Sequence, residues 1–367
     1  MSPKLKILPL KEWIDTKGLP LVISGPCSAE SEDQLMETAR QLAAITQVNV
    51  FRAGIWKPRT RPGDFEGAGE IGLQWLKQVK HETGLLTTVE VADSKHVELA
   101  LKYDVDILWI GARTVVSPFS VQTIADALAG VNIPIMVKNP VNPDIKLWLG
   151  AIERFNAIGI NKLIAIHRGF HYFEKSPFRN APMWEIPIEL KRILPQLPII
   201  VDPSHICGNR ELIESISQKA LDLEMDGLMI ESHLDPDNAY TDIAQQITPA
   251  NLQILLDKLV IRRKKGDIDF QHKLEELRTE IDKLDGELLQ ILAKRMEIID
   301  EIGEYKSEND ITILQMKRWA GIIKDRMSIG THLGLDNIFL KKLLNLIHKE
   351  GIQRQEDIFK KRIEKKD

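Results

Sequence analysis

Four side chains of types that bind divalent metals stand at or after apolar segments of this sequence, far apart along the chain. Cys27 follows "PLVIS", His205 follows "PIIVD", Glu231 lies in "GLMIES", and Asp242 comes soon afterwards. A lone cysteine is usually a small buried hydrophobe, and a lone histidine is usually a structural group. A thiolate, an imidazole and two carboxylates at one point would instead suit Mn, Co, Zn or Fe, without choosing among them.

A set of cations also follows the apolar segments. It comprises Arg52, Lys57, Arg59, Arg113, Lys138 and Arg168. On a helix such a set would be a solvated face, but strand ends make side chains converge, and the charges then repel one another unless anions arrive. Phosphates together with a carboxylate fit such a site best. These residues predict a metal-assisted reaction of phosphorylated small molecules.

Eight apolar runs rich in Val and Ile alternate with helical patterns in the first part of the chain. The runs are "PLVIS", "VNVFRA", "LLTTVEV", "DILWIG", "IPIMVK", "KLIAIH", "PIIVD" and "GLMIES". Such alternation indicates parallel strands with crossover helices, and eight units in about 250 residues fit a (β/α)8 TIM barrel. A doubly wound open sheet is the alternative fold, but it seldom needs eight strands. Closure of a barrel would bring Cys27, His205 and Glu231 together at its C-terminal rim.

The strands stop near "RRKKGD", and the remaining sequence has the pattern of helices. We therefore expect a barrel domain at 1–262, a linker at 263–269 and an all-α domain at 270–367.

Apolar residues at three- and four-residue spacing predict one long helix over 270–306, followed by helices near 312–327 and 336–358 with "SIGTHLG" between the last two. A helix of about 36 residues is about 54 Å long, and its apolar seam is too long to bury in so small a unit. We expect this helix to pair with a second chain.

Arg295 lies on this apolar seam between Ile291 and Ile298, where an unpaired cation would be costly. Lys306 shares the face, since it lies about 20° away in helical angle. Arg278 lies about 26 Å earlier along the axis, so only an antiparallel partner helix would bring it close. A structural arginine at a wet helix crossing is the alternative interpretation.

The composition is that of an ordinary globular protein: of 367 residues, 43% are hydrophobic and 28% are charged. The net charge of −4 gives no electrostatic reason to expect nucleic acid or an anionic membrane as a partner. No apolar run approaches the roughly 20 residues of a membrane span, and "MSPKLKILPLKEW" has no signal-like apolar core. With only Cys27 and Cys207, the chain is no disulfide scaffold. We expect a cytoplasmic protein.

The motifs "GPCS", "KPRT", "GAR", "HRG", "DPSH" and "ESH…DPDNAYTD" together resemble the short form (type I beta) of 3-deoxy-D-arabino-heptulosonate 7-phosphate synthase. The resemblance covers about 20–260. It implies the first reaction of the shikimate pathway, in which phosphoenolpyruvate condenses with erythrose 4-phosphate and phosphate is released. A sister family that makes the eight-carbon octulosonate phosphate shares the barrel, but it typically carries an Asn-containing loop where "KPRT" stands here.

The resemblance also implies roles for single residues. It makes Cys27, His205, Glu231 and Asp242 the ligands of one divalent metal ion. Phosphoenolpyruvate would be held by Arg52, Lys57, Arg113, Lys138 and Arg168, with Lys57 also catalytic. Arg59 and Thr60 would hold the phosphate of erythrose 4-phosphate. Asp202, also catalytic, would lie near the hydroxyl or carbonyl end of that sugar, aimed by a turn that Pro203 fixes.

The segment "LEELRTEIDKLDGELLQILAKRMEIIDEIGEYK" resembles the first helix of an all-helical chorismate mutase. The resemblance implies at least a dimer through the helical domain, with one arginine of each site supplied by the other subunit. The residues carried over are Arg295, Lys306 and Gln355 as catalytic, and Arg278 and Arg318 as substrate-binding. Two positions depart from the family: Gln315 stands where a carboxylate is common, and Trp319 stands where a glutamate commonly contacts the substrate hydroxyl.

We therefore expect a bifunctional, homo-oligomeric shikimate-pathway enzyme that also rearranges chorismate to prephenate, with prephenate or chorismate as a feedback effector. The rearrangement is concerted and needs no nucleophile, so preorganised cations can suffice without the lost carboxylate contact. The alternative is the same synthase with a catalytically weak helical module that only senses the effector.

Overall fold

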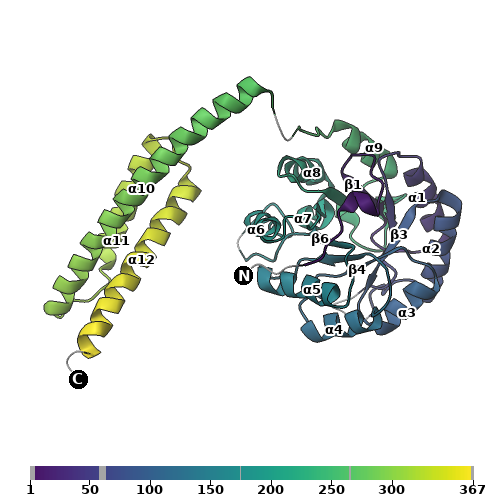
Figure 1. Cartoon of the computed structure of the whole chain (residues 1–367), viewed down its shortest axis with the longest axis horizontal. Coiled ribbons are helices and arrows are strands. Elements are labelled where there is room, and N and C mark those ends of the chain that lie inside the picture. The colour runs from purple at the N-terminus through teal and green to yellow at the C-terminus, as the bar shows by residue number, and fades with distance from the viewer. Residues whose placement is uncertain (1–4, 58–62, 174, 264–265, 365–367) are drawn as a thin grey trace. The chain divides into compact units, whose positions relative to one another are not determined.

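The computed structural model describes the chain in four stretches, which are residues 5–57, 63–173, 175–263 and 266–364. The chain divides into two compact units, residues 1–262 and residues 263–367. Figure 1 shows both units and labels most of their helices and several of their strands.

Eight parallel strands of the first unit form a barrel (Figure 1). They follow one another in sequence order, and β8 pairs with β1 to close the barrel. The strands are β1 Leu21–Gly25, β2 Val50–Arg52, β3 Leu86–Val91, β4 Ile107–Ile110, β5 Ile135–Lys138, β6 Leu163–His167, β7 Ile199–Val201 and β8 Gly227–Glu231. This topology confirms the (β/α)8 barrel and excludes the open sheet, whose outer strands would remain unpaired edges.

Helices surround the barrel and connect its strands. They are α1 Glu32–Ala43, α2 Glu70–Thr83, α3 Ser94–Lys102, α4 Pro118–Ala127, α5 Ile145–Ala157, α6 Glu185–Ile193, α7 Pro203–Cys207, α8 Ile213–Asp222 and α9 Pro249–Lys258. Several begin at a side-chain cap: Ser31, Asp93 and Asp144 each accept a hydrogen bond from a backbone N–H of the first turn. These caps satisfy N–H groups that have no partner inside the helix.

The barrel has two layers of apolar packing. Inside it, residues such as Ile23, Trp109 and Met229 form a filled core, to which Trp13 near the N-terminus also packs. Between the strands and the helices lies a larger cluster that includes Trp148 and Phe155. Both layers rest on strands that are buried on both faces, as expected for a parallel sheet covered by helices.

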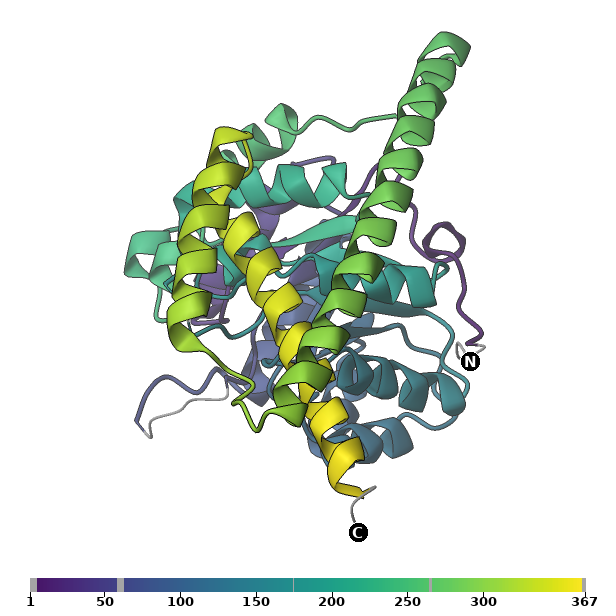
Figure 2. The same cartoon turned by 90° about the vertical axis from the view of Figure 1, so that its left-hand side faces the viewer.

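The second unit contains α10 Ile268–Glu308, α11 Met316–His332 and α12 Asn337–Glu364. Helix α12 packs against both α10 and α11 (Figure 2). The segment "SIGTHLG" was expected to separate the last two helices, but α11 continues through its first five residues to His332. The turn forms only at Leu333 and Gly334, where the glycine has φ 81°.

Within the described residues of the second unit, the first part of α10 is poorly covered. No side chain from 268 to 294 is buried, and the apolar seam residues Ile281, Leu284 and Ile291 are exposed. Among the helices of the described residues, none is long and apolar enough to cross a membrane.

Candidate functional site

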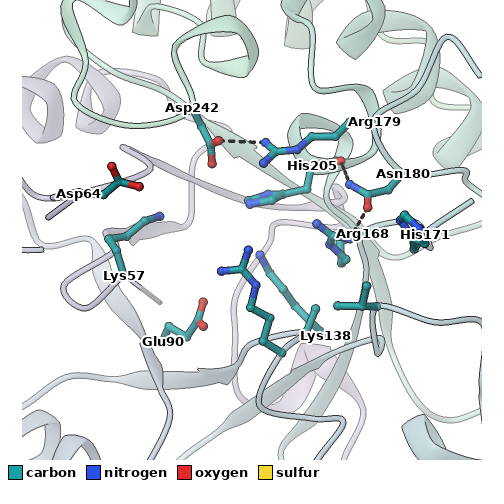
Figure 3. Close-up of a pocket in the computed structure, with 13 residues that line it drawn as sticks. Lys57, Asp64, Glu90, Lys138, Arg168, His171, Arg179, Asn180, His205 and Asp242 are labelled. Atoms are coloured by element: carbon teal, nitrogen blue, oxygen red, sulfur yellow. Dashed lines mark hydrogen bonds and ion pairs between the residues drawn. The ribbon is translucent and has the colours of Figure 1, made fainter. Parts of the chain in front are cut away.

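A cavity of about 590 Å³ lies at the C-terminal rim of the barrel. Its lining comprises Lys57, Asp64, Glu90, Ala112, Arg113, Lys138, Val141, Arg168, His171, Arg179, Asn180, His205 and Asp242. Lys57 and His205 point into the cavity from opposite sides (Figure 3). The lining carries more cations than carboxylates, which favours an anionic ligand.

The end of β7 differs from the expected turn. The strand stops at Val201, and Pro203 is the first residue of the short helix α7 rather than part of a rigid turn. Proline suits that position because the first N–H of a helix has no partner in any case. Asp202 caps the helix by accepting from the N–H of His205 at 3.0 Å, so one carboxylate both starts the helix and sits beside the imidazole.

Barrel closure brings three of the four expected metal ligands together. One ligand atom from each of Cys27, Glu231 and Asp242 lies within 4.8 Å of the others. The register pairs Gly25 of β1 with Glu231 of β8, which explains how residues so distant in sequence meet. Nε2 of His205 lies 3.8 Å from Oε1 of Glu231, so the imidazole borders this group.

The histidine is oriented from its other nitrogen. Nδ1 of His205 lies 2.8 Å from Oδ2 of Asp202, whose Oδ2 also lies 3.0 Å from Nζ of Lys138. A carboxylate at Nδ1 leaves Nε2 available as a ligand, as is common for metal-bound histidines. Burial lowers the pKa of His205 against the opposing effect of Asp202, so the ring is neutral near pH 7.

The cluster has the chemistry of a cation site. Burial, assisted by Glu231, raises the pKa of the Cys27 thiol to about 12, and a bound metal would deprotonate such a thiol. Burial would also raise the pKa of Glu231, but His205 and Arg52 lower it below its usual range. Its Oε1 is buried, lies 3.2 Å from Nη2 of Arg52 and accepts no hydrogen bond from any described residue. A buried anionic oxygen in this condition fits a metal ligand.

Lys57 lies against the thiol. Its Nζ is 3.0 Å from Sγ of Cys27 and 3.0 Å from the carbonyl oxygen of the same residue. Burial lowers the pKa of Lys57, but Cys27 and Glu231 more than compensate, and the net shift is upward. Lys57 therefore stays protonated and supplies a fixed positive charge beside the cluster.

Two of the expected anion-binding cations, Arg52 and Arg168, are held at the rim by buried partners. Arg52 is 2% exposed, lies 5.0 Å from the ring centre of Trp109, and has Nε and Nη1 without a hydrogen-bond partner among the described residues. Arg168 donates to Oδ1 of Asn180 at 2.7 Å, and burial lowers the pKa of Arg168 to about 10. Arginines held this way are preorganised for phosphate or carboxylate.

Of the remaining expected residues of the barrel, only Arg113 lies in the part of the chain that the structure describes. Arg113 follows β4 with an exposed side chain that lines the cavity. Arg59 and Thr60 lie outside the described residues.

Sequence reasoning gave no role to several polar residues of the same rim. Glu90 accepts from Nε1 of Trp109 at 2.9 Å, and Gly111 in "GAR" has no Cβ because one would clash with the Glu90 carboxylate. Arg179 donates to Asp242 at 2.9 Å, and Gln246 accepts from the N–H of Cys27 at 2.9 Å. Arg179 could have been found in the sequence as the cation of "SPFRN". A buried amide such as Gln246 could not, because no sequence spacing distinguishes it from other glutamines.

The helical unit gathers part of the second expected site. Lys306 on α10 donates to Oε1 of Gln355 on α12 at 3.2 Å and to the carbonyl of Ile313 at 2.6 Å. Gly303 permits this close approach of α10 and α12, since a Cβ there would press on Gln355 and Ile358. These contacts place the amide of Gln355, which is buried, beside a cation.

Arg295 lies near the same place. Burial, and then the charge of Arg326, lowers the pKa of Arg295, and its Nη1 is buried without a hydrogen-bond partner among the described residues. Trp319 stacks on His348 with ring centres 3.5 Å apart and planes 7° apart. Burial lowers the pKa of His348, with smaller contributions from Arg295 and Lys306. Trp319, which stands where the family commonly has a glutamate, thus packs against the imidazole of His348. That imidazole lies close to Arg295 and Lys306.

Two other expected residues of this site have exposed side chains. Arg278 is exposed on the first part of α10 and pairs with Glu275 at 3.7 Å. Arg318 on α11 also has an exposed side chain, as does Gln315 before it. The separation of Arg278 from Arg295 follows from the straight helix that carries both, at about 1.5 Å per residue.

Comparisons with known proteins match both units. Residues 7–264 match the DAHP synthetase I family, and residues 277–356 match chorismate mutase type II.

Individual relatives agree with the first match. A phospho-2-dehydro-3-deoxyheptonate aldolase of Thermotoga maritima is 34% identical over 230 residues, covering 63% of this chain and 66% of the relative, just under two thirds of its length. A 2-dehydro-3-deoxyphosphooctonate aldolase of Polaromonas naphthalenivorans is 25% identical over 276 residues, covering 68% and 93%.

The fold of the first unit recurs in a solved structure. The crystal structure of a Thermotoga maritima phospho-2-dehydro-3-deoxyheptonate aldolase (DAHP synthase) has 31% identity and a TM-score of 0.62, covering 70% of this chain and 73% of that one. The chain belongs to the DAHP synthetase I family and carries a chorismate mutase type II domain after its barrel.

Proposed function

We propose that the barrel condenses phosphoenolpyruvate with erythrose 4-phosphate and that the helical unit rearranges chorismate to prephenate. The observation that carries the first activity is a cation-lined cavity of about 590 Å³ that adjoins the cluster of Cys27, Glu231 and Asp242. Two anionic substrates need such cations to lie side by side, and the cluster supplies a place for a metal ion.

The chain's own residues would hold and orient the substrates. Arg52, Arg113, Lys138 and Arg168, with Lys57, would bind the phosphate and carboxylate of phosphoenolpyruvate, and Arg59 and Thr60 would bind the phosphate of the aldose. Asp202 is buried against Lys138 and His205, which line the cavity, so it would act near the hydroxyl or carbonyl end of the sugar by holding these two residues. The result is a fixed approach between the enol carbon and the aldehyde carbon, which form the new bond.

The condensation forms one carbon–carbon bond, consumes one water molecule and releases one phosphate. As the carbon–carbon bond forms, charge develops on the aldehyde oxygen, and water adds to the second carbon of phosphoenolpyruvate before phosphate leaves. A divalent ion held by Cys27, His205, Glu231 and Asp242 would act as a Lewis acid toward that oxygen, and Mn, Co, Zn or Fe would suit the donors. Lys57, which stays protonated, would add positive charge at the same place.

The choice of aldose is the main question that the relatives raise, since they include both heptonate and octonate aldolases. Three carbons from phosphoenolpyruvate leave four carbons for a heptulosonate and five for an octulosonate. We expect turnover with erythrose 4-phosphate and at least about 10²-fold less with a five-carbon aldose phosphate, the scale that a shaped polar site can reach. Preferred turnover of the five-carbon sugar would assign the sister activity.

The mutase site would take Arg295, Lys306, Arg318 and Gln355 from one chain and Arg278 from a second. The exposed apolar seam on the first part of α10 supports this arrangement, because a partner helix would cover it. An antiparallel partner would also carry its own Arg278 along the axis toward Arg295. The cations would hold the two carboxylates of chorismate and stabilise charge that develops on the breaking ether bond. A module that only senses an effector is the less favoured function, because residues 277–356 match chorismate mutase type II.

We also propose that prephenate, bound at the helical site, lowers synthase turnover. The two reactions lie at the start and near the end of one route, and a coupling of about 1–3 kcal/mol would suffice. Prephenate should inhibit the full chain and should inhibit the Arg295→Ala variant at least about tenfold more weakly. Equal inhibition of both proteins would place the effector elsewhere.

A further inference from the structure

A buried amide joins the two carboxylates of the cluster. Gln245, which is 1% exposed, donates from Nε2 to Oε2 of Glu231 at 2.7 Å. Its Oε1 accepts from Nη1 of Arg179 at 2.8 Å, and the same Nη1 donates to Oδ1 of Asp242 at 2.9 Å. One glutamine therefore touches Glu231 directly and Asp242 through a single guanidinium, which Figure 3 shows beside Asp242.

The amide can satisfy both partners in only one orientation. A carboxylate oxygen accepts and never donates, so it must face the amide nitrogen, and a guanidinium only donates, so it must face the amide oxygen. Reversing the amide would set oxygen against oxygen and nitrogen against nitrogen. The side chain of Gln245 is thus locked by charge on both sides.

This lock decides which oxygens remain for a ligand. Oε2 of Glu231 and Oδ1 of Asp242 are occupied by donors, whereas Oε1 of Glu231 lies 3.8 Å from Nε2 of His205. Oδ2 of Asp242 lies 3.3 Å from Sγ of Cys27. Each carboxylate therefore has one oxygen held by an amide or a guanidinium and one oxygen that faces the imidazole or the thiol.

The backbone also fixes the guanidinium that completes this arrangement. The N–H of Arg179 donates to the carbonyl of Cys207 at 3.2 Å, at the end of α7. Gly208 follows with φ 64°, and a Cβ there would clash with the Cβ of Arg179. Asp242 itself has φ 49°, a conformation that aspartate tolerates better than most residues. Backbone constraint at both ends indicates a shaped arrangement rather than an adventitious surface pair.

We propose that Gln245 is a positioning residue that, with Arg179, makes Glu231 and Asp242 each present a single oxygen to a divalent cation. This inference rests on the proposed metal site. Residues that orient ligands in this way typically change metal affinity about 10- to 100-fold when they are replaced. No role in touching the substrates is required of Gln245.

The test is the substitution Gln245→Met, which keeps the size of the side chain and removes both hydrogen bonds. We expect the Kd of the full-length protein for Mn²⁺, measured by equilibrium titration, to rise about 10- to 100-fold. Synthase kcat at saturating Mn²⁺ should recover to within a few-fold of wild type, because the ligands themselves remain. The absorption spectrum of the Co²⁺-loaded variant should shift, since Oε2 of Glu231 is no longer held by the amide. Gln253→Met, the same change at an α9 side chain that binds Asp257, should leave all three quantities unchanged.

Each further result would either overturn the proposal or support it. An unchanged Mn²⁺ Kd in Gln245→Met would overturn it, even if the metal-free variant melted at a lower temperature, because that would be a purely structural role. If Gln245→Met fails to fold, Gln245→Glu replaces it: this variant keeps the acceptor for Arg179, loses the donor to Glu231, and must also bind Mn²⁺ more weakly.

The double variant with Arg179→Met should lose less affinity than the two single losses combined, because both act through one chain of hydrogen bonds. If the wild-type protein bound no divalent metal, the proposed function of the cluster would fail instead, which is a distinct result.

Discussion

The barrel and the helical unit differ in how much of a site one chain can build. At the barrel rim, closure brings Cys27 and Glu231 together across most of the domain, and Arg52 there is 2% exposed. On α10, a straight helix holds Arg278 and Arg295 apart, and Arg278 is 62% exposed. A closed sheet converts distant sequence positions into neighbours, whereas a helix fixes its residues at a distance that only a second chain can overcome.

The two sites should also differ in what they need. The barrel cluster places a thiol and two carboxylates together beside an imidazole, and the helical site places cations beside a buried amide. The first arrangement suits a metal ion and the second suits an organic dianion. A substitution at one site should therefore abolish the activity of that site and leave the activity of the other site intact.

The largest effect should follow from His205→Ala. Loss of the imidazole that borders the cluster should lower metal binding and reduce synthase turnover by about 10³-fold or more, since the reaction would lose its Lewis acid. Asp202 keeps its partner Lys138, so the barrel should stay folded. Mutase turnover should stay within about twofold. His81→Ala, an exposed histidine on α2, is the control, and equal loss in both variants would remove His205 from the site.

Arg295→Ala should have the next largest effect, on the other reaction. Its buried Nη1 has no partner among the described residues, which fits a substrate carboxylate, and removing it should lower mutase turnover about 10²-fold or more. Synthase turnover without effector should be unchanged. Lys294→Ala removes a charge one residue away on an exposed face and should change neither rate. Retained mutase activity in Arg295→Ala would make this arginine structural.

Acid should destabilise the barrel through His167. This ring lies in the β6 end between Phe170 and Trp184, and burial lowers the pKa of His167 to about 3 from 6.5. The unfolded chain binds a proton below pH 6.5 and the folded chain does not, so acidification favours unfolding throughout the window from about pH 6.5 to about pH 3. At pH 4.5 the contribution is about 2–3 kcal/mol.

The measurement is urea unfolding at pH 7 and pH 4.5 in wild type and His167→Gln. The glutamine stays neutral at both values, so the variant should lose less stability on acidification than wild type by roughly the stated amount. An identical pH dependence in the two proteins would show that His167 takes up its proton without unfolding.

The smallest expected effect is a partial recovery of mutase activity when two inactive variants are mixed. Arg278→Ala and Arg295→Ala should each be poor mutases if every site takes one arginine from each of two chains. Subunit exchange at equal concentrations should restore about a quarter of wild-type turnover, because half the dimers are mixed and one of their two sites is intact. No recovery despite verified exchange would place Arg278 outside the site or within its own chain's site.

The fold and site of the barrel could be predicted from the sequence more completely than those of the helical unit. The eight apolar runs predicted the barrel because strands buried on both faces are continuous and apolar, and family motifs at their ends named most of the rim. The turn at Pro203 was wrong, since proline is as suitable for starting a helix as for fixing a turn. Gln245 and Gln246 were missed because a buried amide is defined by its partners, which only the folded chain brings together.

The helical unit was predicted less completely for a physical reason. The seam on α10 was visible as periodicity, but the end of α11 was misplaced because "SIGTH" continues a helix that no proline interrupts. The stack of Trp319 on His348 joins α11 to α12 and has no sequence pattern at all.

One measurement tests most directly the claim that this chain carries two chemically separate sites. Turnover of phosphoenolpyruvate with erythrose 4-phosphate and turnover of chorismate are measured on a single preparation before metal removal by a chelator, after it, and after addition of Mn²⁺ or Co²⁺. We predict that chelation abolishes the first reaction and leaves the second unchanged, and that added metal restores the first. Full synthase turnover in metal-free protein, or parallel loss of both reactions, would contradict the claim.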